Sequence, residues 1–284
     1  QRKLFLHLNF IHFMDLSQVK MVVTDMDGTL LNSKSEVSHQ FFTLYNNLKE
    51  HQVHFVAASG RQYSSIQEKL MSIYTDITII AENGGYIKQG EKELGSIHLS
   101  AEHINLLIPV LRKIEGVYIV LCGKKSAYIE NDHEEFKTIL KEYYTKFDVV
   151  SDLLNEVDDH FFKVAVYHFE SSEAYIYPHV KHLERELQIK VSGANWVDIA
   201  DYRANKGEAV KLLQNRLGVG IKETMVFGDF NNDLEMIDRA YFSYAMENAH
   251  QNVKIAARFQ TKSNNEGGVE HILEELIRSK KANF

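Results

Sequence analysis

KMVVTDMDGTLL, residues 20–31, is the stretch from which the fold can be inferred. Residues 20–24 are rich in apolar and β-branched side chains, which is typical of a strand buried on both faces of a sheet. The run leads directly into Asp25-Met26-Asp27-Gly28-Thr29, where two carboxylates stand two residues apart. A buried strand that ends in polar residues is typical of an open parallel sheet, in which ligands bind at the carboxyl ends of the strands.

An alternation of strands and helices continues on both sides of a long middle segment. The expected strands are short, continuously apolar runs, and Ser38 can cap the first expected helix. This pattern predicts an α/β fold with a doubly wound, Rossmann-like parallel sheet that helices cover on both faces. The expected strands are 54–58, 77–81, 224–227 and 241–245, and the expected helices are 39–51, 63–72, 206–217, 234–240 and 269–279.

The middle segment, residues 85–200, has a different pattern of expected strands and helices. Glycines mark turns near its start, and hairpin-like strands alternate with helices that include Pro109 and Pro178, where proline is unfavourable. We therefore expect an α/β cap of residues 85–200, inserted into a core domain of residues 14–84 and 201–284, with crossings near 84–88 and 200–204. The expected elements are helices at 101–115, 132–146 and 172–187 and strands at 117–121, 127–130, 161–168 and 196–200.

Residues 1–13, QRKLFLHLNFIHF, are basic and then apolar, which resembles a secretory signal. The apolar part is interrupted by His7, Asn9 and His12, and no small-residue cleavage site follows. We therefore expect residues 1–13 to precede a natural start of the protein at Met14. We also expect the protein to be cytoplasmic.

Composition excludes several classes of protein. The 284 residues include 32 Lys and Arg against 39 Asp and Glu, a formal charge of −7, which argues against a nucleic-acid binder. The single cysteine, Cys122, excludes a disulfide framework and a cysteine-rich zinc site within one chain. No apolar run reaches the length of about 20 residues that a membrane span needs, so we expect no membrane partner.

Four polar clusters follow expected strands or begin expected helices, where the carboxyl edge of a parallel sheet would bring them together. Carboxylates that lie close together repel unless a cation joins them, and oxygen ligands without imidazole or thiolate favour Mg²⁺. A serine hydroxyl, a glycine amide and a lysine suit a phosphate. Carboxylates for a metal ion together with donors for a phosphate therefore predict phosphoryl transfer. The clusters are Asp25/Asp27/Thr29, Ser59-Gly60-Arg61, Lys206-Gly207 and Gly228-Asp229-Phe230-Asn231-Asn232-Asp233.

Each cluster by itself has a plainer interpretation. An aspartate after a strand can make a turn, Asp229 can cap a helix, and Lys206 can be a surface charge. A calcium loop beginning at Asp25 is excluded, because Leu30 stands where that loop needs glycine and a strand precedes it. The order and context of all four clusters together favour the catalytic interpretation.

The four clusters resemble the motifs of the haloacid dehalogenase (HAD) superfamily of phosphohydrolases. Residues 25–31, DMDGTLL, resemble the first motif, and 58–61, ASGR, the second, with serine where threonine is commoner. Residues 205–207, NKG, and 228–233, GDFNND, resemble the third and fourth. The insertion after the second motif and the sequence ENGG at 82–85 resemble the Cof-type branch, which carries an α/β (type C2) cap.

The resemblance implies a role for each matched residue. Asp25 would be the nucleophile that forms an aspartyl-phosphate, and Asp27 the general acid and then the general base. Mg²⁺ would be bound by Asp25, Asp229 and the backbone carbonyl of Asp27. Phosphate would be bound by Ser59, Gly60, Lys206 and Asn232. Thr29 and Asp233 would support the site, and Arg61 and Asn83 would contact the substrate or the hinge.

The resemblance also implies a substrate class, small phosphorylated metabolites and often sugar phosphates, but no individual substrate. Tyr118, Tyr128, Tyr167 and His168 could line a substrate pocket, but as members of alternating strands they fit core or sheet-face positions better. Two alternatives stay open. A phosphomutase would return the phosphoryl group to a bound sugar, and a non-catalytic phospho-ligand binder could use the same fold.

Overall fold

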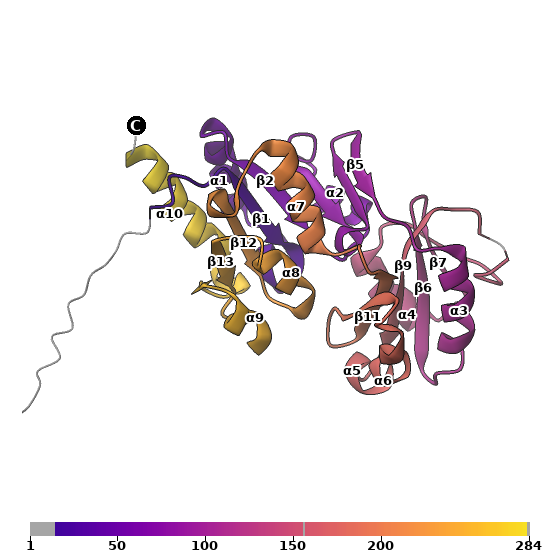
Figure 1. The fold of residues 1–284 in the computed structure, drawn as a ribbon. Helices are drawn as coiled ribbons and strands as arrows, with labels where there is room; N and C mark the ends of the chain where they lie inside the picture. Colours follow the sequence, from indigo (N-terminus) through magenta and orange to yellow (C-terminus); the bar gives the residue numbers. More distant parts are fainter. Residues whose placement is uncertain (1–14, 156, 283–284) are drawn as a thin grey trace, which may run out of the picture.

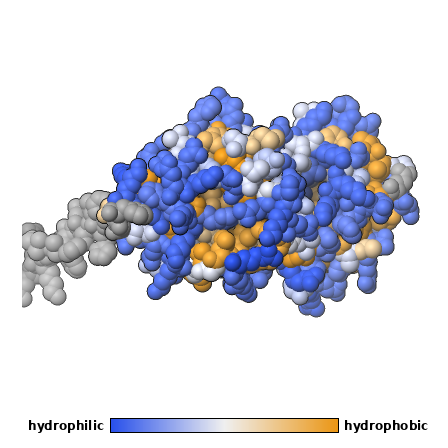
Figure 2. All heavy atoms as spheres, turned by 90° about the horizontal axis from the view of Figure 1, so that it is seen from above, coloured by the Kyte–Doolittle hydropathy of each residue, from blue (hydrophilic) through white to orange (hydrophobic). Residues whose placement is uncertain are grey.

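A computed structural model describes residues 15–155 and 157–282. Within these residues the strands form an eight-stranded and a six-stranded sheet, which lie side by side in Figure 1. The predicted segment 1–13 lies outside the described residues. Among the described helices, none has both the length and the apolarity that crossing a bilayer demands. The face shown in Figure 2 is mainly hydrophilic with scattered hydrophobic areas.

The larger sheet has the predicted parallel core. Its strand order is β14-β13-β12-β1-β2-β3-β4-β5, and the pairs from β14 to β3 are all parallel. Every residue of β1 is buried, as its apolar and β-branched sequence predicts. The strands are β1 (Met21–Asp25), β2 (His54–Ala58), β3 (Thr78–Ala81), β4 (Tyr86–Gln89), β5 (Lys92–Ser96), β12 (Thr224–Gly228), β13 (Phe242–Ala245) and β14 (Phe259–Gln260).

Helices of this larger unit begin where capping predicts. The Ser38 hydroxyl accepts from the backbone N–H of Phe41 at 3.1 Å, which confirms the predicted cap. Asn205 caps the helix that starts at Lys206 by accepting from the backbone N–H of Glu208 at 2.8 Å. The helices are α1 (His39–Glu50), α2 (Tyr63–Lys69), α7 (Lys206–Leu217), α8 (Leu234–Ile237), α9 (Gln251–Ala256) and α10 (Gly268–Ala282).

The smaller sheet has helices packed against both faces. Leu107 and Ile108 of α3 (Ala101–Leu111) belong to one hydrophobic cluster, and Phe136 and Leu140 of α4 (Glu134–Tyr143) belong to another. The strand order is β10-β11-β9-β6-β7-β8. The strands are β6 (Val117–Gly123), β7 (Ala127–Ile129), β8 (Phe147–Val149), β9 (Phe161–His168), β10 (Leu187–Val191) and β11 (Trp196–Asp201), and two short helices are α5 (Ser172–Tyr175) and α6 (Tyr177–Val180).

The prediction of one helix over 172–187 was wrong. The segment forms the separate short helices α5 and α6, and Pro178 lies in the first turn of α6, because proline lacks the N–H that a continuous helix would use there. Beyond it, β10 pairs antiparallel with β11, with Ile189 opposite Ile199. Pro109, by contrast, lies inside α3, which ends at Leu111.

Strands β4 and β5 were expected in the inserted cap, but they extend the larger sheet. β4 pairs antiparallel with β3, and β5 with β4. A short connection after β3 favours such a hairpin-like return over a crossover. The division into a core and a cap of residues 85–200 stays a prediction, and this pairing would move the start of the cap beyond Ser96.

Candidate active site

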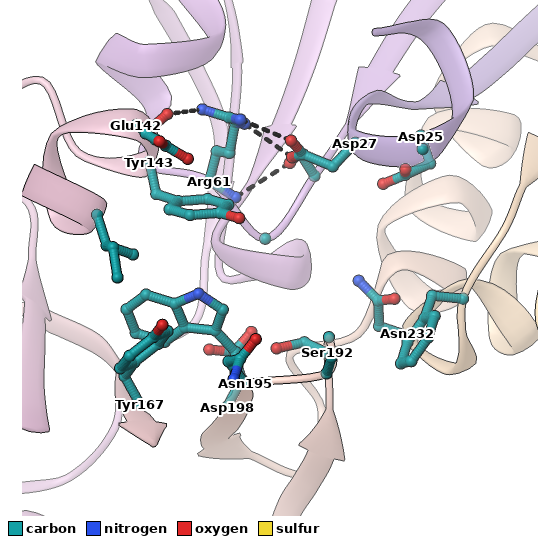
Figure 3. Close-up of a pocket in the computed structure, with 18 of the residues that line it drawn as sticks. Asp25, Asp27, Arg61, Glu142, Tyr143, Tyr167, Ser192, Asn195, Asp198 and Asn232 are labelled. Carbon is teal, nitrogen blue, oxygen red and sulfur yellow. Dashed lines mark hydrogen bonds and ion pairs between the residues drawn. The ribbon is translucent and has the colours of Figure 1, made fainter. Parts of the chain in front are cut away.

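A cavity of about 530 Å³ lies between the two sheets. The carboxyl ends of β1, β2 and β12 border it, so that residues far apart in the sequence meet at one edge of the larger sheet, as predicted. Figure 3 shows its lining side chains. The predicted site residues that line the cavity are Asp25, Asp27, Ser59, Gly60, Arg61, Asp229 and Asn232.

The loop after β1 makes a wide turn over Met26–Leu30, in which Asp27 and Gly28 have non-helical backbone angles. The backbone N–H of Leu31 closes it on the Met26 carbonyl at 2.8 Å. Gly28 has φ +73°, and a Cβ there would lie 2.2 Å from Asp229 Oδ2. Glycine is therefore needed at this position, both for the left-handed backbone and for the close approach of the Asp229 carboxylate.

Lys206 lies behind the cavity and is fully buried. Its ammonium donates to Asp25 Oδ1 at 2.5 Å and to Asp233 Oδ1 at 2.7 Å. Burial opposes the charged form, but the two carboxylates outweigh it and raise the pKa of Lys206. Lys206 therefore favours its charged form and holds the Asp25 side chain in place.

Asp25, Asp229 and Asp233 form a compact acidic group, in which one oxygen of each lies within 4.8 Å of the others. Burial, and next the negative charge of Asp233, raise the pKa of Asp25 to about 7. Burial and the charge of Asp25 raise the pKa of Asp229 well above its usual value. Three carboxylates face one ammonium here, and such an excess of buried negative charge fits a divalent cation.

Hydrogen bonds from neighbouring residues orient two carboxylates of the acidic group, Asp229 and Asp233. Asp233 Oδ2 accepts from the backbone N–H groups of Asp229 at 2.8 Å and Phe230 at 3.1 Å. The Thr29 hydroxyl donates to Asp229 Oδ1 at 3.3 Å. Thr29 and Asp233 are thus placed where they orient Asp229, the kind of supporting contact that ligands of a metal need.

The Asp27 side chain points away from the acidic group and pairs with Arg61. Arg61 Nε and Nη2 donate to the two Asp27 oxygens at 2.7 and 2.6 Å, a bidentate arrangement. Arg61 also donates to the Glu142 carbonyl of α4, and its guanidinium lies 4.8 Å from the centre of the Tyr143 ring. The dashed lines in Figure 3 show that Arg61 links Asp27 to the smaller sheet's helix.

Ser59 and Gly60 lie at the end of β2, beside a second group of amides. Ser59 Oγ accepts from the Arg61 N–H at 3.1 Å. Asn232 Nδ2 donates to Asn83 Oδ1 at 3.1 Å, and Asn83 donates to the Asp198 carboxylate on β11. Asn83 therefore connects the loop after β12 to the smaller sheet, and it does not line the cavity itself.

Most of the cavity wall contributed by the smaller sheet was not predicted from the sequence. Of the aromatic residues considered earlier, Tyr167 lines the cavity, whereas Tyr118, Tyr128 and His168 do not. The Tyr167 ring lies 4.9 Å from that of Trp196, which lies 5.6 Å from that of Tyr143. Figure 3 shows Tyr143 and Tyr167 across the cavity from Asp25. A polar part of this wall is formed by Ser192, Asn195 and Asp198.

Only a weak signal in the sequence pointed to this wall. The segment SGANW at 192–196 combines small and polar residues before an aromatic one, which is common in turns as well as in binding loops. Tyr143 ends an amphipathic helix, where a core position is the usual interpretation.

Comparisons with known proteins agree with this geometry. Residues 22–273 match the family of haloacid dehalogenase-like hydrolases. The chain is 30% identical to an Escherichia coli 5-amino-6-(5-phospho-D-ribitylamino)uracil phosphatase, covering 92% of this chain and 97% of that protein. It is 29% identical to a Bacillus subtilis protein described as a putative phosphatase, covering 92% and 99%. The solved structure of SMU.1108c from Streptococcus mutans has a TM-score of 0.86 at 31% identity, covering 92% and 99%.

Proposed function

The chain belongs to the haloacid dehalogenase-like hydrolase family and is one of its phosphatases, and from this premise we propose that it hydrolyses small phosphorylated metabolites with Mg²⁺ and an aspartyl-phosphate intermediate at Asp25. The observation that carries the proposal is the position of the Asp25 carboxylate. It borders the cavity, Lys206 holds it, and Asp229 and Asp233 lie beside it.

The proposed reaction has two displacements. Asp25 attacks phosphorus, the bond from phosphorus to the ester oxygen breaks, and Asp27 gives a proton to the departing alcohol. Water then attacks the aspartyl-phosphate while Asp27 takes a proton from it, and the bond to Asp25 breaks to release phosphate. In this structure both Asp27 oxygens accept from Arg61, so Arg61 has to release one of them before Asp27 can give a proton to the alcohol or take one from water.

Ser59, the Gly60 amide, Asn232 and Lys206 are proposed to bind the phosphoryl oxygens. Ser59, Gly60 and Asn232 line the cavity together with Asp25, and Lys206 lies behind it with its ammonium on the Asp25 carboxylate. Donors placed in advance stabilise the charge that spreads over the phosphoryl oxygens. Asp25, Asp229 and the Asp27 carbonyl would hold Mg²⁺, with Thr29 and Asp233 orienting the carboxylates. When bound, the ion neutralises phosphoryl charge.

Metal removal tests the proposal directly. We expect hydrolysis of a panel of phosphate esters in buffer with Mg²⁺, and a loss of turnover of at least about 100-fold after excess chelator, because the acidic group then repels the substrate's anionic charge. Phosphate release is the measurement. Restored turnover on adding Mg²⁺, but not Ca²⁺, is the control. Turnover that is indifferent to the chelator would contradict metal dependence.

The cavity wall favours one kind of leaving group within this class. Ser192, Asn195 and Asp198 can bond hydroxyl groups, and beyond them Tyr143, Tyr167 and Trp196 offer flat surfaces to a ring. The Escherichia coli relative is named for a substrate with a ribityl chain and a uracil ring. We therefore propose, alongside simple sugar phosphates, a polyol phosphate that carries a planar ring.

Replacement of Trp196 distinguishes these two leaving groups. Trp196→Ala is expected to lower kcat/KM for the phosphoribitylamino-uracil about 10-fold, because base stacking on an aromatic side chain is lost. Ribitol 5-phosphate, which has no ring, should be hydrolysed as before. The matched control is Tyr118→Ala, since Tyr118 stacks on Phe136 outside the cavity. Equal losses on both substrates would contradict the ring-bearing substrate.

A further inference from the structure

Lys163 is a buried lysine that the proposed chemistry does not use. It lies on β9 of the smaller sheet, and its side chain is 2% exposed. Its ammonium donates to the Gly60 carbonyl at 2.6 Å and pairs with Glu82 at 3.3 Å and Asp198 at 3.1 Å. Lysine is seldom buried so completely unless its charge is paired, so three partners at this one place indicate a specific role.

The backbone carbonyls of residues 59–61 each accept a hydrogen bond from a residue outside this loop, and the Gly60 carbonyl is the middle one of the three. The Ser59 carbonyl accepts from the backbone N–H of Asn83 at 3.0 Å, and the Arg61 carbonyl accepts from that of Glu82 at 3.1 Å. Glu82 and Asn83 have φ values of +51° and +53°, which are strained for residues other than glycine. The smaller sheet supplies the third donor, Lys163.

These contacts determine which way the peptide units of the loop face. In a trans peptide unit the carbonyl and the N–H point in opposite directions. Holding the Gly60 carbonyl against Lys163 therefore directs the Arg61 N–H the other way, where it meets Ser59 Oγ. This contact uses a lone pair of the Ser59 oxygen and not its proton, so the hydroxyl can still donate to a phosphoryl oxygen.

We propose that Lys163 is a positioning residue through which the smaller sheet holds residues 59–61 in their phosphate-binding conformation. The inference rests on the proposed phosphatase function, which gives this loop a phosphoryl group to bind. The contact joins residues 103 positions apart in the chain. Phosphate binding is thereby coupled to the docking of the smaller sheet against the larger one.

Asp198 extends the same arrangement to the other side of the phosphate site. Lys163 and Asp198 lie on the paired strands β9 and β11, where Lys163 is opposite Ala200 and Asp198 is opposite Ala165. The Asp198 carboxylate accepts from Asn83, whose own oxygen accepts from Asn232. Lys163 therefore holds Gly60 directly and supports Asn232 through two intervening side chains.

The test compares two lysines on the smaller sheet that both pair with residues of the larger unit. Lys190 on β10 pairs with Glu235 of α8, but it contacts neither the cavity nor residues 59–61. Lys163→Met and Lys190→Met are assayed for kcat, KM and competitive inhibition by inorganic phosphate, with Mg²⁺ present. For Lys163→Met we expect the inhibition constant to rise at least about 10-fold and kcat/KM to fall about 100-fold, because a small misplacement of binding groups has effects of that size.

The two variants separate positioning from simple support of the fold. For Lys190→Met we expect both constants to stay within about twofold of the wild type, since a partly exposed ion pair contributes little. An unchanged inhibition constant in Lys163→Met would overturn the proposal. An equal rise in Lys190→Met would also overturn it, because any lysine that pairs the smaller sheet with the larger unit would then suffice.

A second variant covers the case in which Lys163→Met does not fold. Lys163→Met with Glu82→Gln removes one of the carboxylates that would otherwise be left buried without a partner, and Glu82→Gln alone is its reference. The same rise in the phosphate inhibition constant is expected relative to that reference, and an unchanged constant refutes the positioning role. If the wild-type chain hydrolyses no ester in the panel, the proposed function fails instead, and the two failures are distinguishable.

Discussion

Asp25→Asn is expected to reduce turnover of phosphate esters by at least about 10⁴-fold, the scale seen when a catalytic nucleophile is removed. An amide oxygen does not attack phosphorus, so the first displacement stops. The fold should persist, because asparagine has the same shape and removes a buried negative charge that Asp229 and Asp233 oppose. The measurement is kcat with 4-nitrophenyl phosphate and Mg²⁺, together with the thermal unfolding midpoint.

Asp76→Asn is the matched control for this variant. Asp76 lies on the surface of the larger unit, where it pairs with Lys49. It should retain wild-type turnover, since the exposed pair is remote from the cavity lining. Turnover near the wild-type value in folded Asp25→Asn would refute the assignment of the nucleophile.

Lys206→Met is expected to lower the free energy of unfolding by about 3–5 kcal/mol, the usual cost of removing one partner from a buried ion pair. Lys206 is completely buried, and its loss leaves the Asp25 and Asp233 carboxylates without their counter-charge. Turnover should also fall at least about 100-fold, because the phosphoryl group loses a positive donor. Urea unfolding without divalent cations gives the stability change.

Lys211→Met on the same helix is the control. Lys211 is half exposed and makes only a loose pair with Glu208, so less than about 1 kcal/mol should be lost. Mg²⁺ should raise the unfolding midpoint of Lys206→Met more than that of the wild type, since a bound cation can replace the missing charge. Equal stability of the Lys206 and Lys211 variants would contradict the proposed role of the buried ammonium.

Local patterns in the sequence were enough to predict the parallel sheet. The buried positions of β1 and β2 are apolar except for Thr24 and Asp25, and Ser38 caps α1 as expected. The middle of the chain was harder to predict. Whether residues 86–96 join one sheet or the other depends on which edge strand is available, and no local pattern carries that information.

The acidic and phosphate-binding residues could be proposed from sequence because each follows a strand of the parallel sheet. The parallel topology then brings Asp25, Ser59 and Asp229 to the same edge of the sheet, whatever the course of the helices that connect the strands. The pairing of Asp27 with Arg61 shows what this logic leaves out, since a bidentate contact requires a particular distance and direction between two loops.

The sequence by itself therefore determined the family, the parallel core and the acidic residues, because these are encoded in short contiguous motifs. Only the tertiary structure decided what surrounds them. Lys163 reaches Gly60 across 103 positions of the chain, and the aromatic wall comes from α4, β9 and β11. The physical reason is that burial and pairing are properties of the space between the two sheets, which exists only after both have folded and docked.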